Sequence, residues 1–153
     1  MARDPYLKFA GHYDRFAGRF TNALRHIAMK MHPPKPGMKV LEVGCGTGTN
    51  LMLYHRAGCS AYGIDLSPSM LEIARTKLGE GTDLQLGDAS NMPYQNNFFD
   101  LVIAMFLLHE MPSEIRPQVM REMIRVTKRE GQILIILVKE HGQGSISKIC
   151  GSL

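Results

Sequence analysis

The chain has 153 residues, 44% of them hydrophobic, with 18 lysines and arginines against 14 aspartates and glutamates. This length and balance predict one folded domain with a single core and argue against a disordered or fibrous protein. No apolar run approaches the ~20 residues of a membrane-spanning helix, the polar N-terminus does not resemble a signal peptide, and three cysteines are too few for a disulfide framework, so a reducing cytoplasm is expected.

Basic residues are scattered along the expected helices rather than gathered in one stretch; examples are Arg15, Arg19, Arg25, Arg121 and Arg125. Interspersed basic residues on amphipathic helices are typical of a solvated face, whereas a nucleic-acid groove concentrates them. No nucleic-acid partner is therefore expected.

The first stretch with helical periodicity covers residues 5–31. Apolar residues recur at spacings of three and four: Phe16, Phe20, Ala23, Leu24, Ile27 and Met31. This spacing predicts one buried face, and Asp14 can cap the start of the helix. Residues 6–14 are rich in aromatic rings and interrupted by glycine, which suits either a lid over a ligand or packing on a sheet. The proline-rich residues 32–37 predict a linker.

Residues 38–49 predict a short buried strand that runs into a glycine-rich turn and opens a helix. Gly44, Gly46 and Gly48 let the backbone bend sharply and approach a nucleotide-like cofactor closely. A nicotinamide fingerprint would need glycine at position 49, which is threonine, and a pyrophosphate beside Glu42 would meet a like charge. A sulfonium cofactor with a free amino group would meet an opposite charge there.

Acidic residues also follow the next two expected strands. Residues 61–65 predict a strand that ends in Asp65, where an acid can accept both hydroxyls of a ribose. Residues 84–89 predict a third strand that runs into Asp88 and Ala89, which suit the amino group and ring nitrogen of adenine. A helix cap and a turn former are the structural alternatives for the two acids, and the order of the three motifs favours the ligand.

The rest of the chain continues the alternation of helices and strands. Helices are predicted over 49–57, over 68–78 and after Ser113, and further strands over 101–105 and 132–138. The last strand is a nearly continuous apolar run, as expected for a parallel strand covered on both faces. The alternation predicts an α/β protein with a doubly wound sheet.

These motifs resemble the class I S-adenosylmethionine (SAM)-dependent methyltransferases, in the small-molecule branch that includes the ubiquinone and menaquinone C-methyltransferases. The family's first motif is the acidic-x-Gly-x-Gly-x-Gly pattern of residues 42–48. Similar segments follow at Pro93-Tyr94, Phe99-Asp100-Leu101-Val102, Leu108-His109 and Arg125-Val126-Thr127-Lys128. The resemblance covers roughly residues 6–139. It implies a Rossmann-like parallel sheet in the order 3-2-1-4-5 with N-terminal helices, in a single domain made of a lid and linker (1–37), a SAM-binding core (38–139) and a short tail (140–153).

The resemblance also implies a site for SAM and its product S-adenosylhomocysteine. The implied cofactor-binding residues are Tyr13, Glu42, Gly44, Cys45, Gly46, Asp65, Leu66, Met70, Asp88, Ala89 and Met105. The segment 42–46 would hold the methionine part, Asp65 the ribose, and Asp88 with Ala89 the adenine. Met105 would border the sulfonium, and Tyr13 would close over it from the lid.

Methyl transfer is an in-line displacement that needs a general base only when the nucleophile carries a proton. His109 is the candidate base because imidazole titrates near neutrality, although a histidine that opens a loop often only bonds to backbone. Tyr13 is a second candidate, able to orient a substrate. Cys45 is expected to be a small loop residue rather than a nucleophile. No Cys/His cluster has metal-ligand spacing, so no metal is expected.

The tail departs from the family pattern. The family's sheet has seven strands, the last two forming a hairpin beside strand five, whereas only 15 residues follow Val138, with no convincing pair of strands. The sheet is therefore expected to lack strands 6 and 7. A homodimer partner, another protein or the folded-back tail would then cover the apolar edge of strand five.

The leading functional prediction is a SAM-dependent methyltransferase for a small acceptor, lipophilic molecules included. The alternative is a SAM-binding subunit that is inactive alone and is completed by a partner or a second copy. A nucleic-acid methyltransferase comes third, and a nicotinamide oxidoreductase is the least favoured.

Overall fold

The computed structural model describes residue 4 and residues 6–8, 10–138 and 144–149, without the side-chain surroundings of residues 13–20, 138 and 144–149. The strands of this part form one sheet in the order β3-β2-β1-β4-β5-β6. The strands are β1 (Lys39–Val43), β2 (Ser60–Asp65), β3 (Asp83–Leu86), β4 (Phe99–Met105), β5 (Thr127–Val138) and β6 (Gly144–Ile149). The first five are parallel, so the predicted order 3-2-1-4-5 is confirmed.

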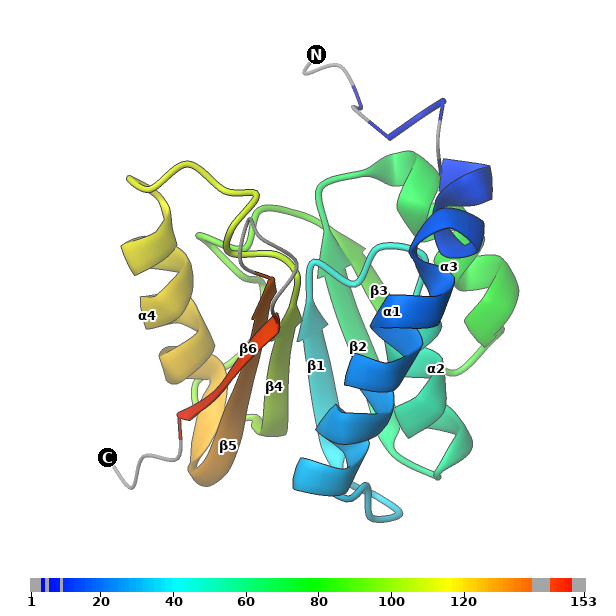
Figure 1. The fold of residues 1–153 in the computed structure, drawn as a ribbon. Coiled ribbons are helices and arrows are strands. Elements are labelled where there is room, and N and C mark those ends of the chain that lie inside the picture. The colour runs from blue at the N-terminus through cyan, green and yellow to red at the C-terminus, as the bar shows by residue number, and fades with distance from the viewer. Residues whose placement is uncertain (1–3, 5, 9, 139–143, 150–153) are drawn as a thin grey trace.

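Helices cover both faces of the sheet, as expected for a doubly wound fold. The helices are α1 (Ala10–Met31), α2 (Thr49–Arg56), α3 (Pro68–Leu78) and α4 (Arg116–Val126). The first three lie on one side of the sheet, and α4 lies on the other (Figure 1).

The central strands are apolar on both faces because each face meets a helical layer. On β4, Leu101 and Ile103 belong to the core beneath α1 and α2, whereas Val102 and Ala104 belong to the core beneath α4. All four side chains are fully buried. A parallel strand between two helical layers has a nearly continuous apolar sequence, and this is why the central strands could be predicted.

The parallel strands end in step at one edge of the sheet. Val43 at the end of β1 pairs with Ile64 of β2 and with Ala104 of β4, and Asp65 pairs with Leu86 at the end of β3. The turn of residues 6–8 lies at this same end (Figure 1). Ligands of open α/β sheets bind beyond such carboxyl ends.

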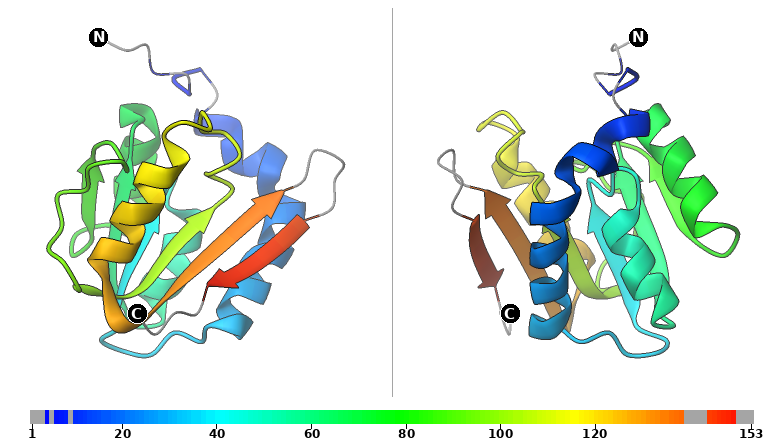
Figure 2. Two further views of the ribbon diagram at one scale, coloured as in Figure 1. Left: turned by 90° about the vertical axis from the view of Figure 1, so that its left-hand side faces the viewer. Right: turned by 45° about the vertical axis from the view of Figure 1, so that its right-hand side comes forward.

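The end of the chain corrects the prediction of a sheet that stops at its fifth strand. β6 runs antiparallel to β5, with Gly144 opposite Val138 and Ile149 opposite Ile133 (Figure 2). Three ways of covering the β5 edge were predicted, and the structure contains the folded-back tail. Because β6 pairs with that edge, β5 needs no second copy or partner there. The unpaired backbone groups of β5 favour such pairing. The residues of β6 do not predict a strand, because glycine, two serines and a lysine leave only two apolar residues among its six.

Two helix starts differ from their predicted caps. α1 begins at Ala10, four residues before Asp14, so Asp14 does not cap it. α4 begins at Arg116, and the Oγ of Ser113 donates instead to the adjacent Glu114 Oε1, at 3.0 Å. Pro117 lies in the first turn of α4, where the fixed φ of proline favours a helix start and its missing N–H costs nothing.

The buried face of α1 is also turned from the predicted one. Leu24, Arg25 and Ala28 are buried, whereas Ile27 is 41% exposed. The guanidinium of Arg25 is tolerated inside because its Nη1 donates to Thr21 Oγ1 and to Asn22 Oδ1. The prediction that Arg25 lies on a solvated face is therefore wrong.

Ser67 is the N-cap of α3, and its Oγ accepts a hydrogen bond from the Met70 N–H at 3.2 Å. We expect Ser67→Ala to lower the free energy of unfolding by about 1 kcal/mol, because that N–H has no partner within the helix. Urea denaturation measures the loss. Ser113→Ala is the matched control and should change the free energy by less than about 0.5 kcal/mol. Equal losses in the two variants would contradict the cap.

Candidate functional site

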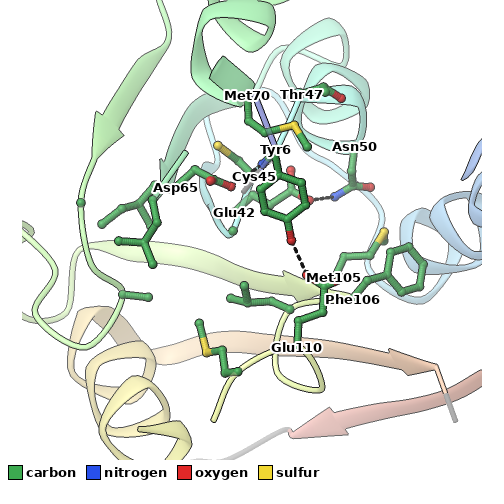
Figure 3. Close-up of a pocket in the computed structure, with 18 of the residues that line it drawn as sticks. Tyr6, Glu42, Cys45, Thr47, Asn50, Asp65, Met70, Met105, Phe106 and Glu110 are labelled. Atoms are coloured by element: carbon green, nitrogen blue, oxygen red, sulfur yellow. Dashed lines mark hydrogen bonds between the residues drawn. The ribbon is translucent and has the colours of Figure 1, made fainter. Parts of the chain in front are cut away.

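A cavity of about 280 Å³ opens at the carboxyl ends of β1 to β4 (Figure 3). Ten of the residues predicted to bind the cofactor line it: Glu42, Gly44, Cys45, Gly46, Asp65, Leu66, Met70, Asp88, Ala89 and Met105. They come from the ends of four strands and from the start of α3. The topology brings them together because neighbouring parallel strands end at the same edge.

The glycine loop needs glycine at each of its three positions. Gly44, Gly46 and Gly48 have φ angles of 69°, 52° and 73°, a region that other residues rarely adopt. A Cβ on Gly44 would also lie 2.6 Å from Leu107 Cδ1. Because Gly44 and Gly46 have no side chains, the backbone of the loop itself lines the cavity at these positions.

Asp65 ties the glycine loop to the start of α3. Its Oδ2 accepts from the Gly46 N–H and its Oδ1 from the Ser67 N–H, both at 2.8 Å. Burial raises the pKa of the Asp65 carboxyl, and these two N–H donors oppose the shift. A carboxylate oxygen has more than one acceptor position, so Asp65 is held in place and can still bind a ligand.

Asp88 forms the turn after β3 as well as lining the cavity. Its Oδ1 accepts from the Ser90 N–H at 2.8 Å, which is ordinary turn chemistry for aspartate. The adjacent Ala89 is buried against the cavity wall. Asp88 therefore has the turn role and also lines the cavity, and its binding of adenine stays a prediction.

Glu42, Asn50 and Arg25 form a buried polar group at one end of the cavity. Glu42 Oε1 accepts from Asn50 Nδ2 at 3.1 Å (Figure 3). Burial raises the pKa of Glu42 to about 8, against the effects of that hydrogen bond and the positive charge of Arg25. In the part of the chain that the structure describes, Glu42 Oε2, Asn50 Oδ1 and Arg25 Nε are buried without hydrogen-bond partners. Two acceptors and a guanidinium suit a ligand that carries an ammonium and a carboxylate.

Sequence reasoning did not place Asn50 or Arg25 in the site. Asn50 follows the glycine loop by two residues, in the first turn of α2, so its position was a usable signal. Arg25 gave no signal, because arginines on amphipathic helices are normally solvated.

The N-terminal segment crosses the mouth of the cavity. The Tyr6 hydroxyl donates to Glu110 Oε2 at 2.7 Å, and the Tyr6 ring lies among the residues that line the cavity (Figure 3). Asp4 anchors the segment to the start of α3, where its carboxylate accepts from Ser67 Oγ at 2.9 Å and from the Ser69 N–H at 3.1 Å. Of the two roles left open for residues 6–14, that of a cover over a ligand fits Tyr6.

His109, the first candidate catalytic residue, lies outside the cavity. His109 is exposed and is not a lining residue, and its backbone carbonyl accepts from Arg116 Nη2 at 3.4 Å. Its neighbour Glu110 lines the cavity instead. Tyr13 lies in α1, and its side chain is outside the described residues. Burial and the nearby carboxylates raise the pKa of the Cys45 thiol, which favours a packing role over a nucleophilic one.

Apolar residues from the loop after β4 form one wall of the cavity. This wall begins at Phe106, which has a φ of 60° and whose N–H donates to the Ile136 carbonyl at 2.9 Å. A positive φ is strained for phenylalanine, and such strain is often found at functional sites. The wall continues through Leu107, Met111, Pro112 and Ile115.

Metal-binding clusters and membrane-spanning helices are both absent from the described residues. Across the described ranges, no three His, Cys, Asp or Glu side chains are grouped so that they could hold a metal ion. None of the helices in those ranges is both long and apolar enough to cross a membrane.

Comparison with known proteins identifies the family. The family model described as a methyltransferase domain matches residues 40–131, which is more than half of the chain. The chain belongs to the methyltransferase domain family. The predicted resemblance to the SAM-dependent methyltransferases of small molecules is thereby confirmed.

Curated relatives and solved structures agree with this assignment. The methyltransferase domain is 37% identical over 130 residues to a phosphatidylethanolamine N-methyltransferase from Cereibacter sphaeroides, covering 81% of this chain and 62% of that protein. It is 34% identical over 116 residues to a demethylmenaquinone methyltransferase from Paenarthrobacter aurescens, covering 75% and 44%. A chain from the complex between the Haloferax volcanii Trm112 methyltransferase activator and a methyltransferase has the same fold, with a TM-score of 0.80 at 21% identity, over 90% of this chain and 62% of that one. The domain therefore spans about half the length of the curated relatives it matches.

Proposed function

We propose that this domain binds SAM in the cavity and transfers its methyl group to a small, lipophilic acceptor. The observation that carries the proposal is the set of acidic residues at the carboxyl ends of β1, β2 and β3, gathered with the glycine loop around one cavity. Each motif alone has a structural explanation. A single cavity that all of them line calls for a ligand with several polar groups along its length.

The buried polar group supports SAM over other nucleotide-like ligands. Glu42 Oε2 and Asn50 Oδ1 can accept from the ammonium of the methionine part, and the guanidinium of Arg25 can donate to its carboxylate. Asp65 would then accept from the ribose hydroxyls, and Asp88 with Ala89 would bind the adenine. A pyrophosphate in the same place would bring acceptor oxygens against the unpaired oxygens of Glu42 and Asn50, with one buried arginine for its two negative charges.

In this proposal the protein contributes mainly positioning and the exclusion of water. SAM supplies a methyl group that is already activated by its sulfonium. The Arg25, Glu42 and Asn50 group would fix the methionine end, and Met105 would border the sulfur. Tyr6 would cover the mouth. The acceptor's lone pair forms the new bond to the methyl carbon while the carbon–sulfur electron pair stays on sulfur. An acceptor protonated at the attacking atom, such as an ammonium, first loses one proton to solvent, because it has no lone pair until then.

The acceptor's lipophilic character is inferred from the wall formed by Leu107, Met111, Pro112 and Ile115. Ile115 is 38% exposed, so the wall reaches the mouth of the cavity and can contact a molecule that extends into solvent. The relatives' names, phosphatidylethanolamine N-methyltransferase and demethylmenaquinone methyltransferase, are in keeping with such an acceptor.

The alternative is a SAM-binding subunit that needs a partner for activity. The structural neighbour from a complex with a methyltransferase activator gives an example of the arrangement.

Transfer of an isotopically labelled methyl group tests the proposal. Purified protein is incubated with methyl-labelled SAM and one of three lipophilic probes: an alkylamine, an alkylphenol or an alkylated naphthohydroquinone. We expect labelled product in the organic phase, together with an equal amount of S-adenosylhomocysteine. Binding of SAM without transfer to any probe would favour the partner-dependent alternative. Absence of SAM binding would overturn both.

A further inference from the structure

The cavity contains one more acidic side chain than the cofactor requires. Four of its lining residues are acidic: Glu42, Asp65, Asp88 and Glu110. The first three lie at the carboxyl ends of β1, β2 and β3 and have assigned partners on SAM under the proposed function. Glu110 follows β4, within the apolar wall between Leu107 and Ile115.

Glu110 is held by an aromatic residue from the other end of the chain. The Tyr6 hydroxyl donates to Glu110 Oε2 at 2.7 Å, 104 positions away in the sequence. In the ranges that the structure describes, Oε1 has no hydrogen-bond donor and is available to a ligand. The hydrogen bond thus orients the carboxylate and brings the Tyr6 ring beside it (Figure 3).

A carboxylate held by a tyrosine hydroxyl is a chemical arrangement that favours a cation. The carboxylate attracts positive charge and accepts N–H hydrogen bonds, and the tyrosine hydroxyl holds it in one orientation. A neutral hydroxyl would gain only an ordinary hydrogen bond here. The apolar neighbours Leu107, Met111 and Pro112 suit the hydrocarbon part of the same ligand.

The charge of SAM strengthens the case for this role. A cationic acceptor would be repelled by the sulfonium in the same cavity, and a carboxylate on the acceptor side offsets that repulsion. We propose that Glu110, oriented by Tyr6, determines acceptor specificity by binding the ammonium group of a lipophilic amine. This inference rests on the proposed function and narrows the acceptor to one chemical class.

Octylammonium and 1-octanol test the proposal, because they share a hydrocarbon chain and differ in charge. Each is titrated calorimetrically into protein saturated with S-adenosylhomocysteine. We expect the parent chain to bind octylammonium about tenfold more tightly than octanol. Glu110→Gln should remove this preference while leaving octanol binding unchanged. Tyr6→Phe, which keeps the ring and loses the hydroxyl, should reduce the preference partially.

Glu114→Gln is the matched control, because Glu114 is an exposed acid on the same loop and does not line the cavity. It should keep the full preference for octylammonium. Equal binding of the two probes by the parent chain, or a preference that survives in Glu110→Gln, would overturn the proposal. Failure of the proposed function would appear separately, as failure of S-adenosylhomocysteine to bind, and the same probes titrated into the cofactor-free chain would still test Glu110.

Discussion

Glu42→Gln is expected to remove a loss of stability that the parent chain undergoes as the pH rises. The ordinary pKa of a glutamate is 4.5, and burial raises that of Glu42 to about 8. Between these values the folded chain holds a proton that the unfolded chain has released. The contribution of Glu42 to stability is therefore fully present below pH 4.5 and is lost as the pH rises through about 8.

The effect is large because Glu42 is buried without a full set of hydrogen bonds. The shift corresponds to a free energy on the order of 4 kcal/mol once the carboxyl is ionised. Glutamine stays neutral, and its amide can donate to the unpaired Asn50 Oδ1. Urea denaturation of the two cofactor-free chains at several pH values measures the difference. The exposed Glu80 provides a control, and Glu80→Gln should follow the parent chain at every pH. Parallel curves for the parent chain and Glu42→Gln would contradict the buried, protonated carboxyl.

Asp65→Asn is expected to weaken SAM binding roughly 100-fold. The carboxylate would accept hydrogen bonds from two ribose hydroxyls, and each hydrogen bond to a charged group contributes about 1.5–3 kcal/mol. Asparagine has one acceptor oxygen in place of two, and its NH₂ group would face the N–H of either Gly46 or Ser67. Calorimetric titration with SAM measures the change, after circular dichroism has established that the variant is folded.

Asp83→Asn separates this effect from a general loss of negative charge. Asp83 lies at the start of β3, at the opposite end of the strand from the cavity, and does not line it. We expect it to bind SAM as the parent chain does. If Asp65→Asn also bound normally, Asp65 would be a structural tie between the glycine loop and α3 and not a ribose ligand.

The parallel core of the fold could be predicted from the sequence because its signals are local and repeated. β1, β4 and β5 contain apolar runs, and glycines or a serine cap mark ends of α2 and α3. All neighbouring parallel strands except β1 and β4 also follow one another along the chain. β6 could not be predicted in this way, since its position depends on the open edge of β5 rather than on its own residues. The buried face of α1 could not be predicted either, because it depends on how Leu24 and Ala28 pack against the sheet.

The candidate site likewise contains residues that could be predicted from local sequence and residues that depend on tertiary contacts. Glu42, Asp65 and Asp88 could be found because each follows a strand end, and parallel strands bring such ends together. Tyr6 and Arg25 could not, since they reach the cavity from a segment and a helix whose placement is set by tertiary contacts. Glu110 was overlooked beside His109, because the sequence does not tell which of two adjacent loop residues points into a cavity.

Calorimetric titration of the parent chain with SAM tests the central claim most directly, with NADH as the comparison ligand. A SAM site formed by Glu42, Asp65 and Asp88 predicts saturable binding with one ligand per chain, competition by S-adenosylhomocysteine, and no binding of NADH. Tight binding of NADH with none of SAM would contradict the account, because a pyrophosphate would then occupy the place assigned to the methionine part beside Glu42.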